Sequence, residues 1–245
     1  MLLLKHNRTK EEGNEMSDNM AMEIEQMLVE AWKKFFDYYN KKVPEYPKSW
    51  GQGLDKKGAK ESHWICWNEY DLMFHIGRFF YEALKKKEER EGKKGDNKFS
   101  NIEIHFEKNI NSANFKGYKF EGRLDELKEN LKMKKGPKVD MIVTYEDKND
   151  PFLVCAEVKY LHSASEHYQK TPIEKITNDI KKLKAIRDCG IAKKVIFMLF
   201  DDYYWFTDEK TAKGIEDELK RIEKDENIKV LSDSSNAKLE KYQCK

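Results

Sequence analysis

The chain has 245 residues, of which 39% are hydrophobic and 38% are charged, and it contains 13 Phe, 12 Tyr and 5 Trp. This content excludes a disordered chain and suffices for a sizeable core, so we expect one folded domain with additions. The 47 basic and 45 acidic residues nearly cancel, to a net charge of +2. Any surface that binds a polyanion must therefore come from local clusters of basic residues.

The four cysteines lie singly along the chain and form no Cys-x-x-Cys pair. This pattern favours neither a disulfide framework nor a structural zinc site, and it fits a reducing, cytoplasmic environment. The apolar start Met1–Leu4 is too short for the core of a signal peptide, and no stretch reaches the length of a membrane span. We therefore expect a cytoplasmic protein that is not attached to a membrane.

The N-terminal part of the chain predicts a helix between two polar segments. Residues 1–16 are polar and lack an apolar period, which is typical of a flexible leader. From Met20 to Tyr39, apolar residues recur at helical spacing and predict an amphipathic helix. Prolines and glycines follow and predict a linker, so residues 17–66 form an N-terminal helix and linker.

A second helix is predicted from Trp67 to Arg90, with a stop near Gly92. Its predicted apolar stripe consists of Tyr70, Met73, Phe74, Phe80 and Leu84. The segment Asn101–Ile110 then alternates between apolar and polar residues, which predicts a half-exposed strand. A short helix is predicted at Leu124–Met133, within a Lys-rich stretch.

Two apolar runs carry charges where strands are usually apolar. The runs Lys138–Tyr145 and Phe152–Tyr160 are joined by a short polar turn, so they predict two paired strands. Side chains alternate across a strand, so Glu157 and Lys159 share one face of the second strand. Asp140 lies in the first strand, and pairing of the strands brings the three charged groups together at one end of a sheet.

This predicted site contains more negative than positive charge. Asp140 lies between Val139 and Met141, which we expect on the opposite face of the strand. Two buried carboxylates need a cation, and Lys159 alone does not neutralise both. Carboxylate oxygens and water suit Mg²⁺ or Mn²⁺, and no His or Cys lies at the ligand spacing of zinc. With Lys159 to orient a water or to counter charge on phosphorus, these residues predict phosphodiester hydrolysis by Asp140, Glu157 and Lys159.

Asp140 followed in the next strand by Glu157-Val158-Lys159 resembles the signature of the PD-(D/E)xK phosphodiesterases, the restriction-endonuclease-like superfamily of Mg²⁺-dependent nucleases. Val139 stands where the name of the family has Pro. Other acid-x-Lys triplets occur in the chain, but only this one lies in an apolar strand with an Asp-bearing strand before it. The resemblance implies an α/β fold with a restriction-endonuclease-like αβββαβ core and a mixed central sheet.

The resemblance also implies roles for individual residues. Asp140, Glu157 and the main-chain carbonyl of Val158 would hold Mg²⁺ or Mn²⁺, and Lys159 would assist the attacking water. Glu69, in the first turn of the second helix, would complete the catalytic site, although an acid there can equally stabilise the helix dipole by up to about 1 kcal/mol. The implied function is that of a hydrolase, an endo- or exodeoxyribonuclease with DNA as substrate. RNA stays open, and a homodimer would suit cleavage of both strands of a duplex.

The remaining elements complete the predicted core. A capping box at Thr171–Glu174 opens a helix that ends at Gly190, and the apolar run Val195–Phe200 predicts a strand covered on both faces. A helix at Thr211–Lys224 and a strand at Ile228–Leu231 form a C-terminal extension. The nuclease-like domain therefore spans residues 67–231, and residues 232–245 form a polar tail.

Four basic clusters are candidates for contact with a phosphate backbone: Lys85–Lys87, Lys93 with Lys94, Lys132 with Lys134, Lys135 and Lys138, and Lys181 with Lys182 and Lys184. Any one of them can equally form a solvated surface. The run from Lys132 to Lys138 stands out, because few acids offset it and it leads into the Asp140 strand. Two alternative functions stay open. The first is a protein of the same fold that has lost catalysis and binds nucleic acid or a partner protein. The second is a structural α/β interaction protein, in which Asp140 or Glu157 only forms an ion pair with Lys159.

Overall fold

The computed structural model describes residues 2–42, 68–93, 98–111, 113–116, 118, 120, 122–145, 151–161, 172–201, 209–225 and 227–234. The predicted linker from residue 43 to residue 66 and residues 235–245 of the predicted tail lie outside these residues. The predicted start of the tail at Ser232 is wrong, because residues 232–234 belong to the last strand. The described elements are, in order, α1 (Leu2–Lys42), α3 (Glu69–Gly92), β1 (Ile102–Asn109), α4 (Arg123–Asn130), β2 (Lys138–Tyr145), β3 (Phe152–Leu161), α6 (Pro172–Asp188), β4 (Ala192–Asp201), α7 (Glu209–Asp225) and β5 (Lys229–Ser234).

The strands form one mixed sheet in the order β1-β2-β3-β4-β5. The pairs β1–β2 and β2–β3 are antiparallel, whereas β3–β4 and β4–β5 are parallel. The α6 and α7 helices make the crossovers that parallel neighbours require. The α/β class and the mixed central sheet predicted from the sequence are confirmed, and the predicted C-terminal helix and strand are α7 and β5.

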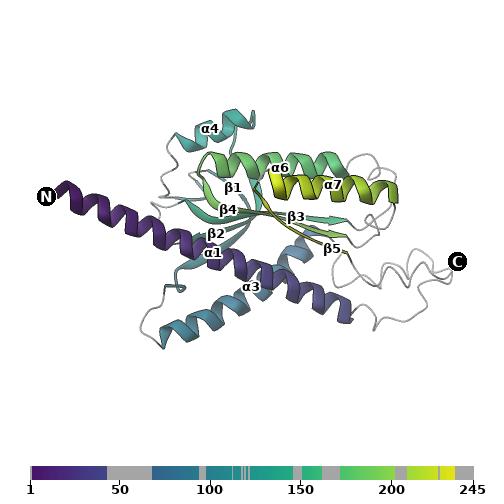
Figure 1. Ribbon diagram of the computed structural model, residues 1–245, viewed down its shortest axis with the longest axis horizontal. Coiled ribbons are helices and arrows are strands. Elements are labelled where there is room, and N and C mark those ends of the chain that lie inside the picture. The colour runs from purple at the N-terminus through teal and green to yellow at the C-terminus, as the bar shows by residue number, and fades with distance from the viewer. Residues whose placement is uncertain are drawn as a thin grey trace.

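Helices cover both faces of the sheet. Figure 1 shows α1 and α3 on one face and α6 and α7 on the other. Each face has its own apolar core: Met198 and Phe200 pack with α1 and α3, whereas Phe197 and Leu199 pack with α6 and α7. This two-sided burial explains why β3 and β4 are continuous apolar runs instead of alternating ones.

The first helix is longer than predicted. The predicted stripe from Met20 to Tyr39 is confirmed, with Ile24, Leu28 and Phe35 fully buried. The predicted start of the helix after residue 16 is wrong, because α1 begins at Leu2. Residues 2–16 are rich in Leu, Lys, Glu and Met, which favour helices, so the helix continues beyond the stripe that packs on the protein.

The buried face of α3 is rotated from the predicted one. Met73, Phe80 and Leu84 are buried as predicted, but Tyr70 and Phe74 are 61% and 66% exposed. The buried side of α3 is formed by Leu72, Met73, Ile76 and Phe80, and Tyr70 and Phe74 lie beside it on the exposed side. A Cβ atom at Gly77 would lie 2.6 Å from the ring of Phe106, so the helix approaches β1 closely at this residue. Within the described residues, no helix is long and apolar enough to cross a membrane.

Candidate functional site

The site forms where β2 and β3 part. Their pairing runs from Val143–Val154 to Met141–Ala156 and does not continue to Asp140 and Glu157. There the carboxylate of Asp140 enters the gap, and its Oδ2 accepts a hydrogen bond of 2.8 Å from the main-chain N–H of Val158. A side-chain oxygen thus replaces the main-chain acceptor that a continuous ladder would supply. We call this point, between Asp140 and Glu157, the strand fork.

The neighbouring strand β1 is also irregular at this level. Glu107 lies between the residues that pair with Val139 and Met141, and its φ of 56° is in the left-handed region. Such backbone strain in a residue other than glycine tends to occur at functional sites. The expectation that Val139 and Met141 share a face is wrong, because Val139 packs in the core below α6 and Met141 in the core below α1 and α3. The irregular backbone at this level breaks the simple alternation.

Glu157 is the most deeply buried acid of the site, with a side chain that is 1% exposed. Its Oε2 lies 2.6 Å from Nζ of Lys182 on α6, and this ammonium also donates to the main-chain oxygen of Lys138 at 3.0 Å. The other oxygen, Oε1, is buried and has no hydrogen-bond partner among the residues that the structure describes. Burial and the nearby charge of Asp140 raise the pKa of Glu157 well above its ordinary value, against the opposing effect of Lys182.

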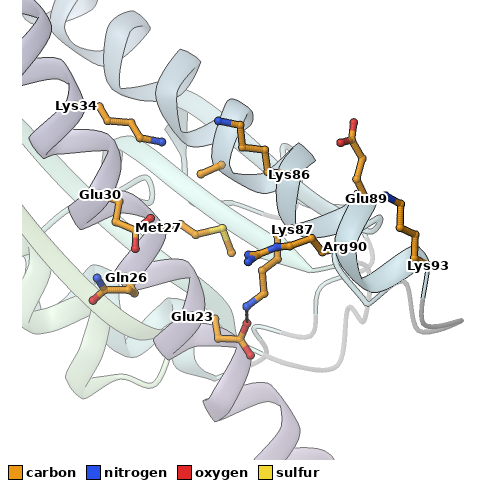
Figure 2. Close-up of a pocket in the computed structure, with 11 residues that line it drawn as sticks. Glu23, Gln26, Met27, Glu30, Lys34, Lys86, Lys87, Glu89, Arg90 and Lys93 are labelled. Carbon is orange, nitrogen blue, oxygen red and sulfur yellow. Dashed lines mark ion pairs between the residues drawn. The ribbon is translucent and has the colours of Figure 1, made fainter.

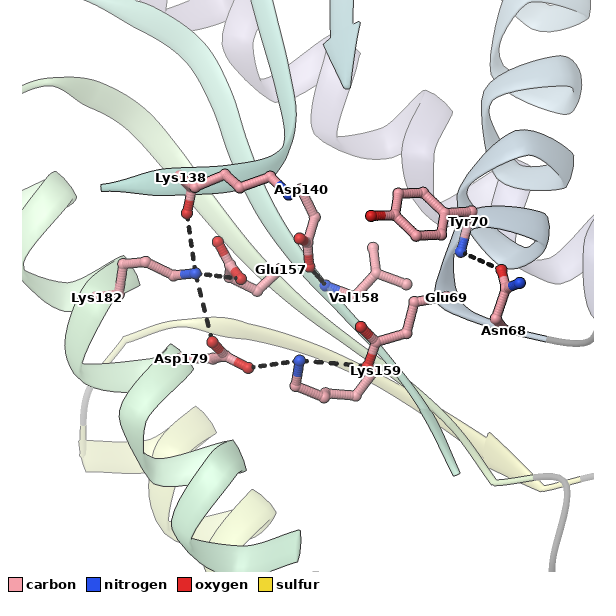
Figure 3. A network of polar contacts seen from close by, with 10 residues as sticks. All are labelled: Asn68, Glu69, Tyr70, Lys138, Asp140, Glu157, Val158, Lys159, Asp179 and Lys182. Carbon is pink, nitrogen blue, oxygen red and sulfur yellow. Dashed lines mark hydrogen bonds and ion pairs between the residues drawn. The ribbon is translucent and has the colours of Figure 1, made fainter. Parts of the chain in front are cut away.

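Lys159 connects two helices across the end of the sheet. Its Nζ lies 3.0 Å from Oδ2 of Asp179 on α6 and 3.3 Å from Oε1 of Glu69 on α3 (Figure 3). Burial lowers the pKa of Lys159, but the charges of Asp179 and Glu69 raise it by more, so its net pKa lies above the ordinary value. The side chain therefore remains an ammonium at neutral pH.

The structure brings together the side chains of Asp140, Glu157, Lys159 and Glu69, all four predicted catalytic residues. Glu69 begins α3, where the carboxamide of Asn68 accepts hydrogen bonds from the N–H groups of Tyr70 and Asp71. Because Asn68 caps the helix, Glu69 is available to contact Lys159. Val158 contributes its N–H to the site, and a metal-binding role of its carbonyl stays a prediction.

Two further residues belong to the site: Asp179, which was not predicted, and Lys182, which was predicted only as part of a basic cluster. Their Oδ1 and Nζ atoms lie 3.4 Å apart, and each also contacts one of the two charged residues of β3. The sequence held a signal for them. At helical spacing, Asp179 and Lys182 lie on the same face as Leu183 and Ile186, and charges inside an apolar stripe need partners.

The donor set determines which cation the site can accept. Among the described residues, no group of three or more His, Cys, Asp and Glu side chains is arranged to hold a metal ion. Asp140 and Glu157 nevertheless present two carboxylates at the fork, one of them with a buried oxygen that lacks a partner. Mg²⁺ characteristically binds to one or two carboxylates and completes its shell with water and substrate oxygens. These residues fit such an ion, provided that the ammonium of Lys182 moves away from Glu157.

Comparisons with models of known protein families, with curated proteins and with solved structures found no match. The chemistry of the site is therefore the basis for any assignment of function.

Proposed function

We propose that this protein is a metal-dependent nuclease of the PD-(D/E)xK type that hydrolyses phosphodiester bonds, with DNA as its principal substrate. The observation that carries the proposal is the meeting of Asp140 and Glu157 at the strand fork, with Lys159 beside them. The element order α3-β1-β2-β3-α6-β4, with α4 inserted after β1, agrees with a restriction-endonuclease-like core. Asp140 lies on the second strand, β2, and Glu157 and Lys159 lie on the third, β3, which are the positions that the resemblance implies.

The electrostatics of Glu157 argue against a purely structural ion pair. A stabilising pair would satisfy both carboxylate oxygens, but Oε1 of Glu157 is buried without a partner. Such a group costs about 1–3 kcal/mol, and its raised pKa means that the fold disfavours its charge. An arrangement that is unfavourable without a further cation is more typical of a functional site than of a structural one.

Each residue of the site has a separate role in the proposed hydrolysis. A bound Mg²⁺ or Mn²⁺ would polarise a phosphoryl oxygen and lower the pKa of a bound water. Asp140, Glu157 and the carbonyl of Val158 would hold this ion. Lys159 is kept protonated by its acidic neighbours, so it donates hydrogen bonds to the phosphate or the water and does not remove a proton. Glu69 and Asp179 act as positioning residues that hold the Lys159 ammonium in place.

Cleavage of supercoiled and single-stranded DNA, with Mg²⁺, Mn²⁺ or EDTA, tests this proposal. We expect metal-dependent cleavage that falls by about 100–1000-fold or more in Lys159→Met, since one removed electrostatic donor has an effect of this size. Lys193→Met is the matched control, because Lys193 makes a comparably buried ion pair with Asp18 at 2.8 Å, at the other end of the sheet. Cleavage that persists in EDTA, or equal rates in both variants, would contradict the proposal.

One observation favours the alternative of a catalytically inactive protein of the same fold. The ammonium of Lys182 contacts Glu157 at 2.6 Å, where it can substitute for a metal ion. In that case Mg²⁺ would not raise the melting temperature, since only a ligand that binds the native state stabilises it. DNA binding without cleavage and without this shift would support the alternative. A homodimer stays a prediction, which sedimentation analysis would check.

A further inference from the structure

A groove of about 730 Å³ lies between the end of α4 and the outer side of α6. We call it the α4–α6 groove. Its lining includes Lys132 and Met133 from the α4 side and Asp179, Lys181, Lys182 and Lys184 from α6. The fold thus brings Lys132 of one basic cluster to the same surface as Lys181, Lys182 and Lys184 of another, which is far away along the chain.

The groove carries a net positive charge. Its lining has four lysines and two acids; Asp188 pairs with Arg187 at 2.7 Å, and Asp179 pairs both with Lys159 at 3.0 Å and with the groove residue Lys182 at 3.4 Å. Lys132 and Lys181 are exposed, and neither forms an ion pair with any residue that the structure describes. Ammonium groups of this kind attract phosphates and are available to contact them.

The groove is continuous with the strand fork. Asp179 and Lys182 line the groove and also contact Lys159 and Glu157 (Figure 3). A chain of phosphates in the groove would therefore lie next to the two residues that contact Lys159 and Glu157. No comparable connection exists for the other basic groove in the described part of the chain.

That second groove, of about 520 Å³, lies between α1 and α3 and is drawn in Figure 2. We call it the α1–α3 groove. Its lining has five basic residues, Lys34, Lys86, Lys87, Arg90 and Lys93, and three acids, Glu23, Glu30 and Glu89. Lys86 and Arg90 are exposed, as Lys132 and Lys181 are in the α4–α6 groove. It contains none of the residues of the strand fork. The molecule thus offers a matched basic surface that is separate from the candidate site.

We infer that the α4–α6 groove binds the phosphodiester backbone of a nucleic acid and leads it to the strand fork. The inference rests on the proposed function and identifies the surface that recognises its substrate. Recognition by lysine ammonium groups depends on phosphate and not on base edges, so binding in this groove is independent of sequence.

Fluorescence anisotropy of labelled oligonucleotides of two unrelated sequences tests the inference, with the full chain in EDTA over a series of salt concentrations. The groove variant is Lys132→Gln with Lys181→Gln, and the control variant is Lys86→Gln with Arg90→Gln. We expect the groove variant to bind both sequences more weakly, with a slope of log K against log salt that is smaller by about 2, one unit per lost phosphate contact. The control variant should match the unmodified protein.

The inference is overturned if the unmodified protein does not bind either oligonucleotide, or if both variants lose affinity equally. Hydrolysis of the small diester bis(p-nitrophenyl) phosphate with Mn²⁺ separates it from the proposed function. This substrate is too short to use the groove, so the groove variant should retain the rate of the unmodified protein on it. If no protein hydrolyses any substrate, the proposed nuclease function fails while the binding measurements still decide the role of the groove.

Discussion

The two faces of β3 differ in what they contribute to the protein. On one face, Val158 and Tyr160 pack in an apolar layer, where the Tyr160 ring stacks on Phe200 at 5.8 Å. On the other face, Glu157 and Lys159 meet the charged residues of α6. Adjacent residues of one strand thus enter a well-packed core and an unfavourable cluster of charge. The packing of the apolar face therefore offsets the unfavourable burial of charge on the other face.

The largest expected effect concerns the apolar face. Phe200 is fully buried, and its ring lies 5.0 Å from Tyr39 and 5.2 Å from Phe35. Phe200→Ala should lower the free energy of unfolding by about 3–5 kcal/mol through lost burial and a cavity. Urea denaturation followed by circular dichroism measures the loss. A loss below about 1 kcal/mol would show that packing on the apolar face does not stabilise the protein as strongly as described.

The second prediction concerns the competition between Lys182 and a metal ion on the charged face. Lys182→Met removes the ammonium that contacts Glu157, so the affinity for Mn²⁺ should rise. Close buried charge pairs have coupling energies from about 1.5 kcal/mol upwards, which corresponds to about tenfold in affinity. Calorimetric titration with Mn²⁺ measures the change, with Lys193→Met as control. Equal or weaker binding in Lys182→Met would show that this lysine does not compete for the site.

The third prediction is that replacing the buried Glu157 raises the stability of the protein, whereas replacing a buried residue usually lowers it. The raised pKa of Glu157 means that the native state holds its proton more tightly than the unfolded chain does. Its stabilising contribution is therefore present at acid pH and is lost as the pH rises above the ordinary carboxyl pKa of about 4.3. Glu157→Gln does not titrate, so without metal it should melt above the unmodified protein at pH 8, by a margin that shrinks toward pH 4. A variant that melts lower at pH 8 would contradict the raised pKa.

The smallest expected effect tests the orientation of α3. Phe74 is 66% exposed, so Phe74→Ser should change stability by no more than about 0.5 kcal/mol. The adjacent Met73 is buried, and Met73→Ala should lower stability by about 2–5 kcal/mol. Thermal melting of the two variants compares the faces directly. Similar losses would favour the stripe expected from the sequence over the observed one.

The sequence predicts the strands and the central carboxylates well because both depend on local patterns. The bounds of β2 agree with the predicted run, and β3 differs only by the addition of Leu161. Asp140 and Glu157 stand out because a charge within an apolar strand is visible in a few residues of sequence. Their meeting also follows from simple pairing of neighbouring strands.

The remaining features depend on contacts between distant parts of the chain. Asp179 and Lys182 are visible in the sequence as charges within the apolar stripe of α6, but their partners Lys159 and Glu157 are determined only when α6 packs over β3. The orientation of α3 depends on which of its apolar residues pack against the rest of the fold: Leu72, Met73, Ile76 and Phe80 lie in the core, whereas Tyr70 and Phe74 are exposed. The left-handed backbone of Glu107 likewise could not be predicted from the sequence, because glutamate rarely adopts this conformation.

The hydrogen bond from the Val158 N–H to Asp140 offers a way to measure whether an ion is bound at the strand fork. Oδ2 of Asp140 is engaged by the amide, so an ion at the strand fork would bind through Oδ1 and pull on the same carboxylate. The exchange rate of this one amide with deuterated solvent should therefore respond when the site is filled. Asp140→Asn can keep an oxygen acceptor for the amide, whereas Asp140→Ala cannot. Labelling of Val158 would thus distinguish a lost ligand from a damaged strand.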